Sequence, residues 1–211
     1  MMSTLIADAQ KYIEQVMADL TGDDDFPPFL ALENSKGEVM IAMLRASSKG
    51  DEARDMMADM MAALCLAHRA VAVLFASVCW MVTCDSQEEA FNLAAAPSEH
   101  PDRKEAIVLT ATRNLGNTTE AHIANVIREN NLVGVGLWEE MDGSEAAGRF
   151  VSAMKFGLRL APRLPKVFCD VVDKALNSDN LEDTQRILTM MAETIGKIRR
   201  GEVGPGSPLM N

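Results

Sequence analysis

The most concentrated polar chemistry in this sequence lies in one proline-rich segment, residues 97–103. Its sequence is Pro-Ser-Glu-His-Pro-Asp-Arg, which places a histidine, two carboxylates and a guanidinium close together. A histidine beside carboxylates can act as a general acid or base, and an arginine can hold a carboxylate or phosphate through two parallel hydrogen bonds. The candidate catalytic residues are therefore His100, Glu99, Asp102 and Arg103.

A structural role for residues 97–103 competes with catalysis. Pro97 and Pro101 stiffen the backbone, so the segment can also be a rigid connection between strands in which the charged side chains pair with one another. The sequence fixes no nucleophile or second histidine nearby that would complete a catalytic group. We therefore expect a structural role first, contact with a ligand or partner second, and catalysis last.

Trp80, the segment 97–103 and Glu105 follow one another in an order that resembles an uncharacterised family of bacterial and bacteriophage proteins. The resemblance extends over about residues 75–138 and implies no activity. Related sequences carry a glutamate between a serine and the tryptophan, where this chain has Val78, and this departure disfavours an enzyme. On this pattern we expect a binding surface. Its residues would be Trp80, His100, Arg103, Arg128 and Trp138.

Two other patterns superficially suggest a metal or a cofactor. Cys65 and His68, followed by Cys79 and Cys84, are residue types that bind zinc. Cys79 and Cys84 are five positions apart, however, so on a regular strand they point to opposite faces. The glycines at 134 and 136 lack the third glycine and the helix start of a dinucleotide site. We expect neither a metal nor a cofactor.

The negative charge is concentrated in the first half of the chain. Residues 1–100 hold 16 acidic and 6 basic side chains, out of 31 and 20 in the whole sequence of 211 residues. Such a surface repels phosphate, so direct binding of nucleic acid is not expected. The acid-free basic segment 149–166 is expected to dock on this acidic half, in the same chain or in a neighbour.

The cysteines and the hydropathy pattern indicate a cytoplasmic protein. The four cysteines lie in apolar surroundings, which favours free thiols in a reducing compartment. The N-terminus has no basic region followed by an apolar core, so no signal peptide is expected. The longest apolar run, residues 70–82, is too short to cross a bilayer, and membrane insertion is not expected.

The first half of the sequence predicts two helices and three strands. Residues 4–20 have helical apolar spacing, and residues 29–33 and 38–44 flank a turn that ends in Gly37, as in a β-hairpin. Asp51 is expected to cap a second helix. Residues 71–83 are apolar on both alternating faces, which predicts a strand in the interior of a sheet.

The second half predicts further strands and then helices. Strand 105–112 is followed by residues 119–129, which suit a strand or a helix. We favour the strand because residues 132–138 continue a β-like run with two glycines. Helices are expected at 145–156, capped by Ser144, at 166–176 and at 181–200. The last helix spaces its apolar residues like a short heptad seam, which suggests a homodimer.

This order, α-β-β-α-β-β-β followed by helices, predicts an α+β fold with an antiparallel sheet of about five strands and helices on one face. The order alone resembles profilin-like, roadblock-type and GAF-like domains, and it transfers no residues. We expect a sheet domain at 1–160, a helical extension at 161–200 packed on it or on a neighbouring subunit, and a flexible tail at 201–211.

We expect a non-enzymatic binding or assembly protein of bacterial or phage origin that associates with itself or with a protein partner. One alternative is a hydrolase or nucleic-acid-processing enzyme that uses the segment 97–103. The other is an acidic inhibitor whose carboxylates imitate the phosphates of DNA. Those carboxylates would be Asp23, Asp24, Asp25, Asp51, Glu52, Asp55 and Asp59. The sequence names no small-molecule ligand.

Overall fold

The computed structural model describes residues 2–22, 24–44, 50–84, 86, 88, 92–93, 95–143, 148–163 and 181–202. The helices are α1 (Met2–Asp19), α2 (Asp51–Ala67), α4 (Arg149–Leu160) and α6 (Leu181–Arg199), with short 3-10 turns η1 (Asn114–Gly116) and η2 (Ala161–Arg163). The strands are β1 (Phe29–Asn34), β2 (Val39–Met43), β3 (Ala70–Met81), β4 (Lys104–Arg113), β5 (Thr118–Glu129), β6 (Leu132–Val135) and β7 (Glu139–Met141). The expected helix at 166–176, Ser144, Cys169 and the tail beyond 202 lie outside the described residues.

The sheet has seven strands, in the order β2-β1-β3-β4-β5-β6, with β7 also paired to β5, and every pairing is antiparallel. The α+β class is therefore confirmed. Residues 118–129 form a strand, as we favoured. The sheet exceeds the expected five strands because the two halves of β5 pair separately with β7 and β6.

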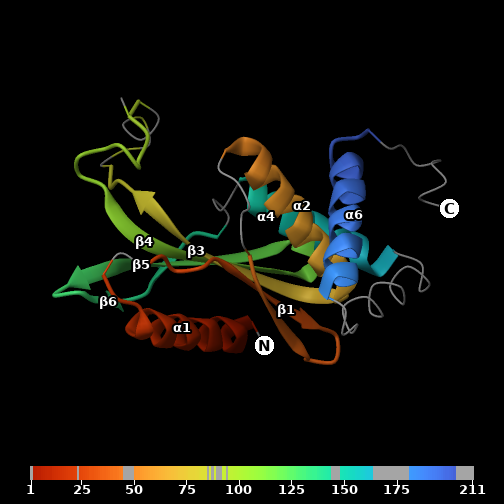
Figure 1. Cartoon of the computed structure of the whole chain (residues 1–211), viewed down its shortest axis with the longest axis horizontal. Coiled ribbons are helices and arrows are strands. Elements are labelled where there is room, and N and C mark those ends of the chain that lie inside the picture. The colour runs from red at the N-terminus through yellow and green to blue at the C-terminus, as the bar shows by residue number, and fades with distance from the viewer. Residues whose placement is uncertain are drawn as a thin grey trace.

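The interior position of β3 is confirmed, because it pairs with β1 on one side and β4 on the other. Alternate side chains in its middle belong to two apolar cores, Ala72, Leu74 and Ala76 to one and Val73 and Phe75 to the other. Figure 1 shows α1 beneath the sheet and α2, α4 and α6 above it. The expectation of helices on one face is wrong, because a strand with two apolar rows requires cover on both faces.

The layer above the sheet is held together by close packing of small residues. In α4, a Cβ added to Gly157 would lie 2.6 Å from the Cβ of Cys65 in α2, so the two helices meet at backbone distance. In α6, Met191, Ala192 and Ile195 are buried on the alanine-rich face of α2. The apolar seam of the last helix therefore packs within the chain. Its buried side chains are not exposed for the dimer contact that was expected from the seam.

Two details of the helix ends differ from expectation. Asp51 is the first residue of α2 rather than its cap, since the cap position is Gly50, and no side chain bonds there. Gly148 takes the same position before α4. Both glycines have positive φ, 112° and 116°, a conformation that a side chain disfavours. Within the described residues, none of the helices combines the length and the hydropathy needed to span a membrane.

Candidate functional site

Trp80 and Arg103 form an exposed pair at one end of the sheet. Trp80 lies opposite Glu105 in the β3–β4 register, and the guanidinium carbon of Arg103 is 4.9 Å from the centre of the Trp80 ring. This distance allows a cation–π interaction, worth about 0.5–1 kcal/mol at an exposed site. Trp80 is 44% exposed. The pair therefore presents a flat aromatic surface with one positive charge to solvent.

Arg128 anchors the strand next to this pair. Its Nε and Nη2 donate to the two carboxylate oxygens of Glu105 at 2.7 and 3.0 Å, a two-bond fork. Its guanidinium also donates to the carbonyl oxygens of Gly22 and Asp24, at 2.6 and 3.2 Å. One side chain thus joins β5, β4 and the connection that follows α1. This use is structural, and it holds Glu105, the residue opposite Trp80 in the β3–β4 register.

His100 makes its contacts within its own turn. Its Nδ1 accepts the backbone N–H of Asp102 at 3.2 Å, and the carboxylate of Asp102 lies 4.0 Å from the same nitrogen. The backbone N–H groups of Glu99 and His100 donate to the carbonyl of Ala96. Because Nδ1 is an acceptor here, the neutral ring carries its proton on Nε2. These contacts agree with a structural connection between strands, in which the residues of the segment 97–103 bond to one another.

Trp138 makes its contacts with α1 and the core. Its Nε1 donates to the carboxylate of Glu14 in α1 at 3.0 Å, and its ring packs against the core on that side of the sheet. The five predicted binding residues therefore divide into an exposed pair, Trp80 and Arg103, two anchoring residues, Arg128 and Trp138, and His100 in its turn.

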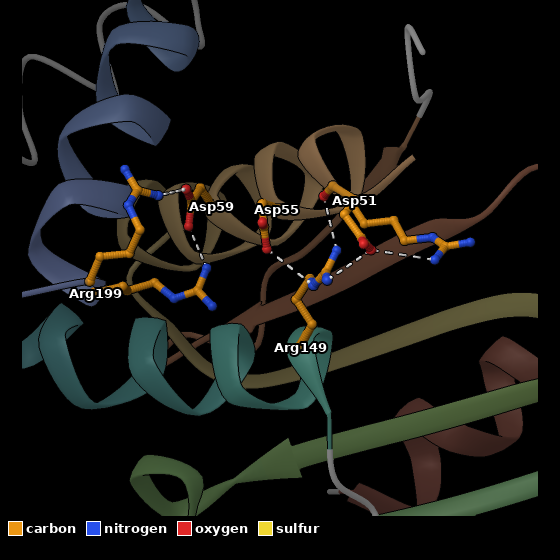
Figure 2. A network of polar contacts seen from close by, with 7 residues as sticks. Asp51, Asp55, Asp59, Arg149 and Arg199 are labelled. Carbon is orange, nitrogen blue, oxygen red and sulfur yellow. Dashed lines mark hydrogen bonds and ion pairs between the residues drawn. The ribbon is translucent and has the colours of Figure 1, made fainter. Parts of the chain in front are cut away.

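A second polar cluster joins the helices above the sheet (Figure 2). Arg149, in the first turn of α4, lies between Asp51 and Asp55 of α2, and its guanidinium is 3.1 Å from each carboxylate. It also donates to the carbonyl of Asp51 at 3.0 Å. The expected docking of the basic segment on the acidic half is confirmed for Arg149, and it occurs within the same chain.

Asp59 is the most buried member of this cluster. It accepts hydrogen bonds from Arg199 and Arg200 of the last helical segment, the second at 3.3 Å (Figure 2). A hollow of about 300 Å³ beside it is lined by Asp55, Asp59, Ser152, Phe156, Arg199 and Arg200. This pairing was not predicted from the sequence. The available signal was a charged residue on the otherwise methionine- and alanine-rich face of α2.

The thiols differ in burial. Cys65 is fully buried, while Cys79 and Cys84 are partly buried. Burial raises the pKa of Cys65 to about 12 and also raises that of Cys79, so both stay protonated at neutral pH. Metal ligation by cysteine requires the thiolate. Within the described part of the chain, no group of three or more acidic, histidine or cysteine side chains is arranged to hold a metal.

A third feature lies at the free edge of the sheet. Among the strands that the structure describes, β2 pairs only with β1, and its Val39, Ile41 and Met43 are 53%, 50% and 45% exposed. They share a face because side chains alternate along a strand. The hairpin was expected from the sequence, but its position at the edge was not, because edge position depends on which strand pairs with β1 on the other side.

The chain is thus an α+β protein with an antiparallel sheet covered on both faces, an exposed Trp80–Arg103 pair and an apolar sheet edge. No family model matches this sequence, and neither the curated proteins nor the solved structures include a significant match.

Proposed function

We propose that this protein is a non-enzymatic binding and assembly module, of bacterial or phage origin, whose contact surface is the free edge of the sheet at β2. The observation that carries this proposal is the row formed by Val39, Ile41 and Met43, each about half exposed. An exposed patch of large apolar side chains is typical of a surface that contacts another protein.

The composition of β2 supports the same conclusion. Its sequence, Val-Met-Ile-Ala-Met, contains no charged residue and no proline. Soluble proteins commonly protect a sheet edge with charged residues or proline, because an open row of backbone N–H and C=O groups can pair with another chain. β2 lacks this protection in a protein with a net charge of −11, where charged side chains are plentiful.

Contact at this edge would be stabilised by burial of the apolar side chains of β2. Burying a whole valine, isoleucine or methionine side chain contributes about 1.5–3 kcal/mol. Covering the exposed halves of three such side chains therefore contributes on the order of 2–4 kcal/mol, before any backbone pairing is counted. This amount suits a reversible association.

The two alternative functions receive less support. The hydrolase hypothesis depends on His100, whose Nδ1 is engaged by the backbone of Asp102. The DNA-mimic hypothesis depends on free carboxylates, and Asp51, Asp55 and Asp59 are all paired with arginines of the same chain.

The test compares wild type with Ile41→Lys and with the matched control Leu137→Lys, which places the same charge at a residue that is 90% exposed and lies outside β2. Light scattering after size-exclusion chromatography and affinity capture from cell extract measure association. We expect Ile41→Lys to lose association that Leu137→Lys keeps. Equal behaviour of the two variants, or no association by wild type, contradicts the proposal.

A further inference from the structure

The backbone at β2 has a definite donor and acceptor pattern. The N–H of Asn34 donates to the carbonyl of Glu38 at 3.1 Å, and the N–H of Leu44 donates to the carbonyl of Pro28 at 2.8 Å. Residues 38 and 44 therefore direct their backbone groups toward β1. Because this direction alternates along an antiparallel strand, the odd-numbered residues of β2 direct their N–H and C=O groups outward.

The outward backbone groups and the exposed side chains belong to the same residues. Val39, Ile41 and Met43 carry both, since the odd-numbered positions are also the exposed ones. A strand that paired with this edge would therefore satisfy three donors and three acceptors and lie beside the apolar row. α1, which covers the face of the sheet on which Val39, Ile41 and Met43 lie, packs on β3, β4 and β6.

We infer that the occupant of this edge is a second copy of the chain, paired antiparallel through β2 about a two-fold axis at Ile41. This inference rests on the function proposed above and identifies its partner. In this register Ile41 faces Ile41 of the other copy, and Val39 faces Met43. Met40 faces Ala42 on the opposite side of the sheet, so every cross-strand pair is apolar.

The register is determined by the length of β2. Pairing about Ile41 satisfies all three outward residues of each copy within the strand. A shift of two residues in either direction leaves one outward residue of β2 opposite a position beyond the strand. A shift of one residue is excluded because it would oppose side chains that point to different faces.

Charge directs a contact between two copies to β2 rather than to other parts of this half. Residues 1–100 carry 16 acidic and 6 basic side chains, so two copies repel each other over most of this half. β2 is a five-residue stretch without charge, where this repulsion is smallest. Two-fold pairing also uses the same surface on both copies, the commonest arrangement in soluble homo-oligomers.

Single cysteines test the register. On a background with Cys79, Cys84 and Cys169 replaced by serine, Ile41→Cys places two thiols at Cα positions about 5.5 Å apart, within the range for a disulfide. Val39→Cys alone and Met43→Cys alone place them about 13 Å apart along the strand. We expect mild oxidation to cross-link Ile41→Cys with itself. Val39→Cys alone and Met43→Cys alone should not cross-link, but an equal mixture of these two variants should. Cross-linking of Val39→Cys alone, or none with Ile41→Cys, overturns the inference.

Sedimentation of wild type and Ile41→Lys over about 1 μM to 1 mM separates this inference from the proposed function, because an edge contact of this size is expected to be weak. Two lysines would face each other at the axis, so we expect the dissociation constant to rise at least about 100-fold with an unchanged far-UV spectrum. A dimer that survives Ile41→Lys overturns both this inference and the contact surface proposed above. A monomeric wild type that captures another protein, and loses it on Ile41→Lys, overturns the second copy alone.

Discussion

Gly196 of α6 lies directly against the carboxylate of Asp59 in α2, so closely that a Cβ built on the glycine would overlap Oδ2. Glycine inside a helix costs about 1 kcal/mol relative to alanine. Here its missing side chain makes room for a mostly buried carboxylate that accepts hydrogen bonds from Arg199 and Arg200. The approach of α6 to α2 thus depends on one backbone position.

The first prediction is that Gly196→Ala destabilises the fold, although alanine is the better helix former. Overpacking costs typically about 1–3 kcal/mol and exceeds the gain of about 1 kcal/mol in helix propensity. We expect a net loss of about 1–2 kcal/mol in the free energy of unfolding, measured by urea denaturation. Lys197→Ala, at an exposed position of the same helix, is the control and should change it by less than about 0.5 kcal/mol. Stabilisation by Gly196→Ala would show that the carboxylate does not occupy this position.

The second prediction concerns the fork between Arg128 and Glu105. Arg128→Lys keeps the charge but removes the two parallel bonds, at side chains that are 28% and 15% exposed. We expect a loss of about 1.5–3 kcal/mol of unfolding free energy, the value of hydrogen bonds to a charged group.

Arg54→Lys is the matched control for Arg128→Lys. Arg54 lies 3.7 Å from Asp51, and both side chains are mostly exposed. Such pairs contribute little, so the change should stay below about 0.5 kcal/mol. If the two substitutions have equal effects, the fork between Glu105 and Arg128 is not a stabilising contact.

The third prediction is a stability loss at alkaline pH caused by Cys65. Burial raises the pKa of this thiol from 9.0 to about 12, so the folded state holds the proton more tightly than the unfolded state does. Its contribution is complete below about pH 9 and is lost as the pH rises from there toward 12. The slope attributable to one thiol is up to about 1.4 kcal/mol per pH unit.

Urea denaturation of wild type and Cys65→Ala at a series of pH values from 8 upward isolates this effect, because the other titrating groups are common to both. We expect the difference in stability between the two proteins to shrink as the pH rises above about 9. A difference that is independent of pH would mean that the thiol reaches solvent in the folded state.

The elements that could be predicted are those with strong local patterns. β3 was placed in the interior because Val73 and Leu74 belong to two alternating rows that are both apolar. Two apolar rows on β3 already required cover on both faces of the sheet. The order of the elements, however, suggested a single layer of helices. β6 was expected only as part of the longer run 132–138, and β7, at Glu139–Met141, has too few residues for a period to emerge.

The candidate site was predictable only in part. Trp80 and Arg103 are 23 positions apart, and the structure brings them together because the β3–β4 connection returns to the end of β3. The partner of Asp59 lies 140 positions away, and no local periodicity links residues at that separation. Exposure of Val39, Ile41 and Met43 likewise depends on which strand takes the other side of β1.

The fourth prediction uses charge to test how two β2 strands align. If Val39 faces Met43 of another copy, Val39→Lys combined with Met43→Glu in one chain creates two opposite-charge pairs across the dimer. Cross-strand pairs of opposite charge contribute about 0.2–1 kcal/mol each, and like charges directly opposite destabilise. We therefore expect this variant to remain dimeric, and the control Val39→Lys with Met43→Lys to be monomeric. Within one strand the two positions are about 13 Å apart, too far to pair, so the difference reports contact between copies. Sedimentation at matched concentration measures it, and equal dimerisation of both variants would contradict this alignment.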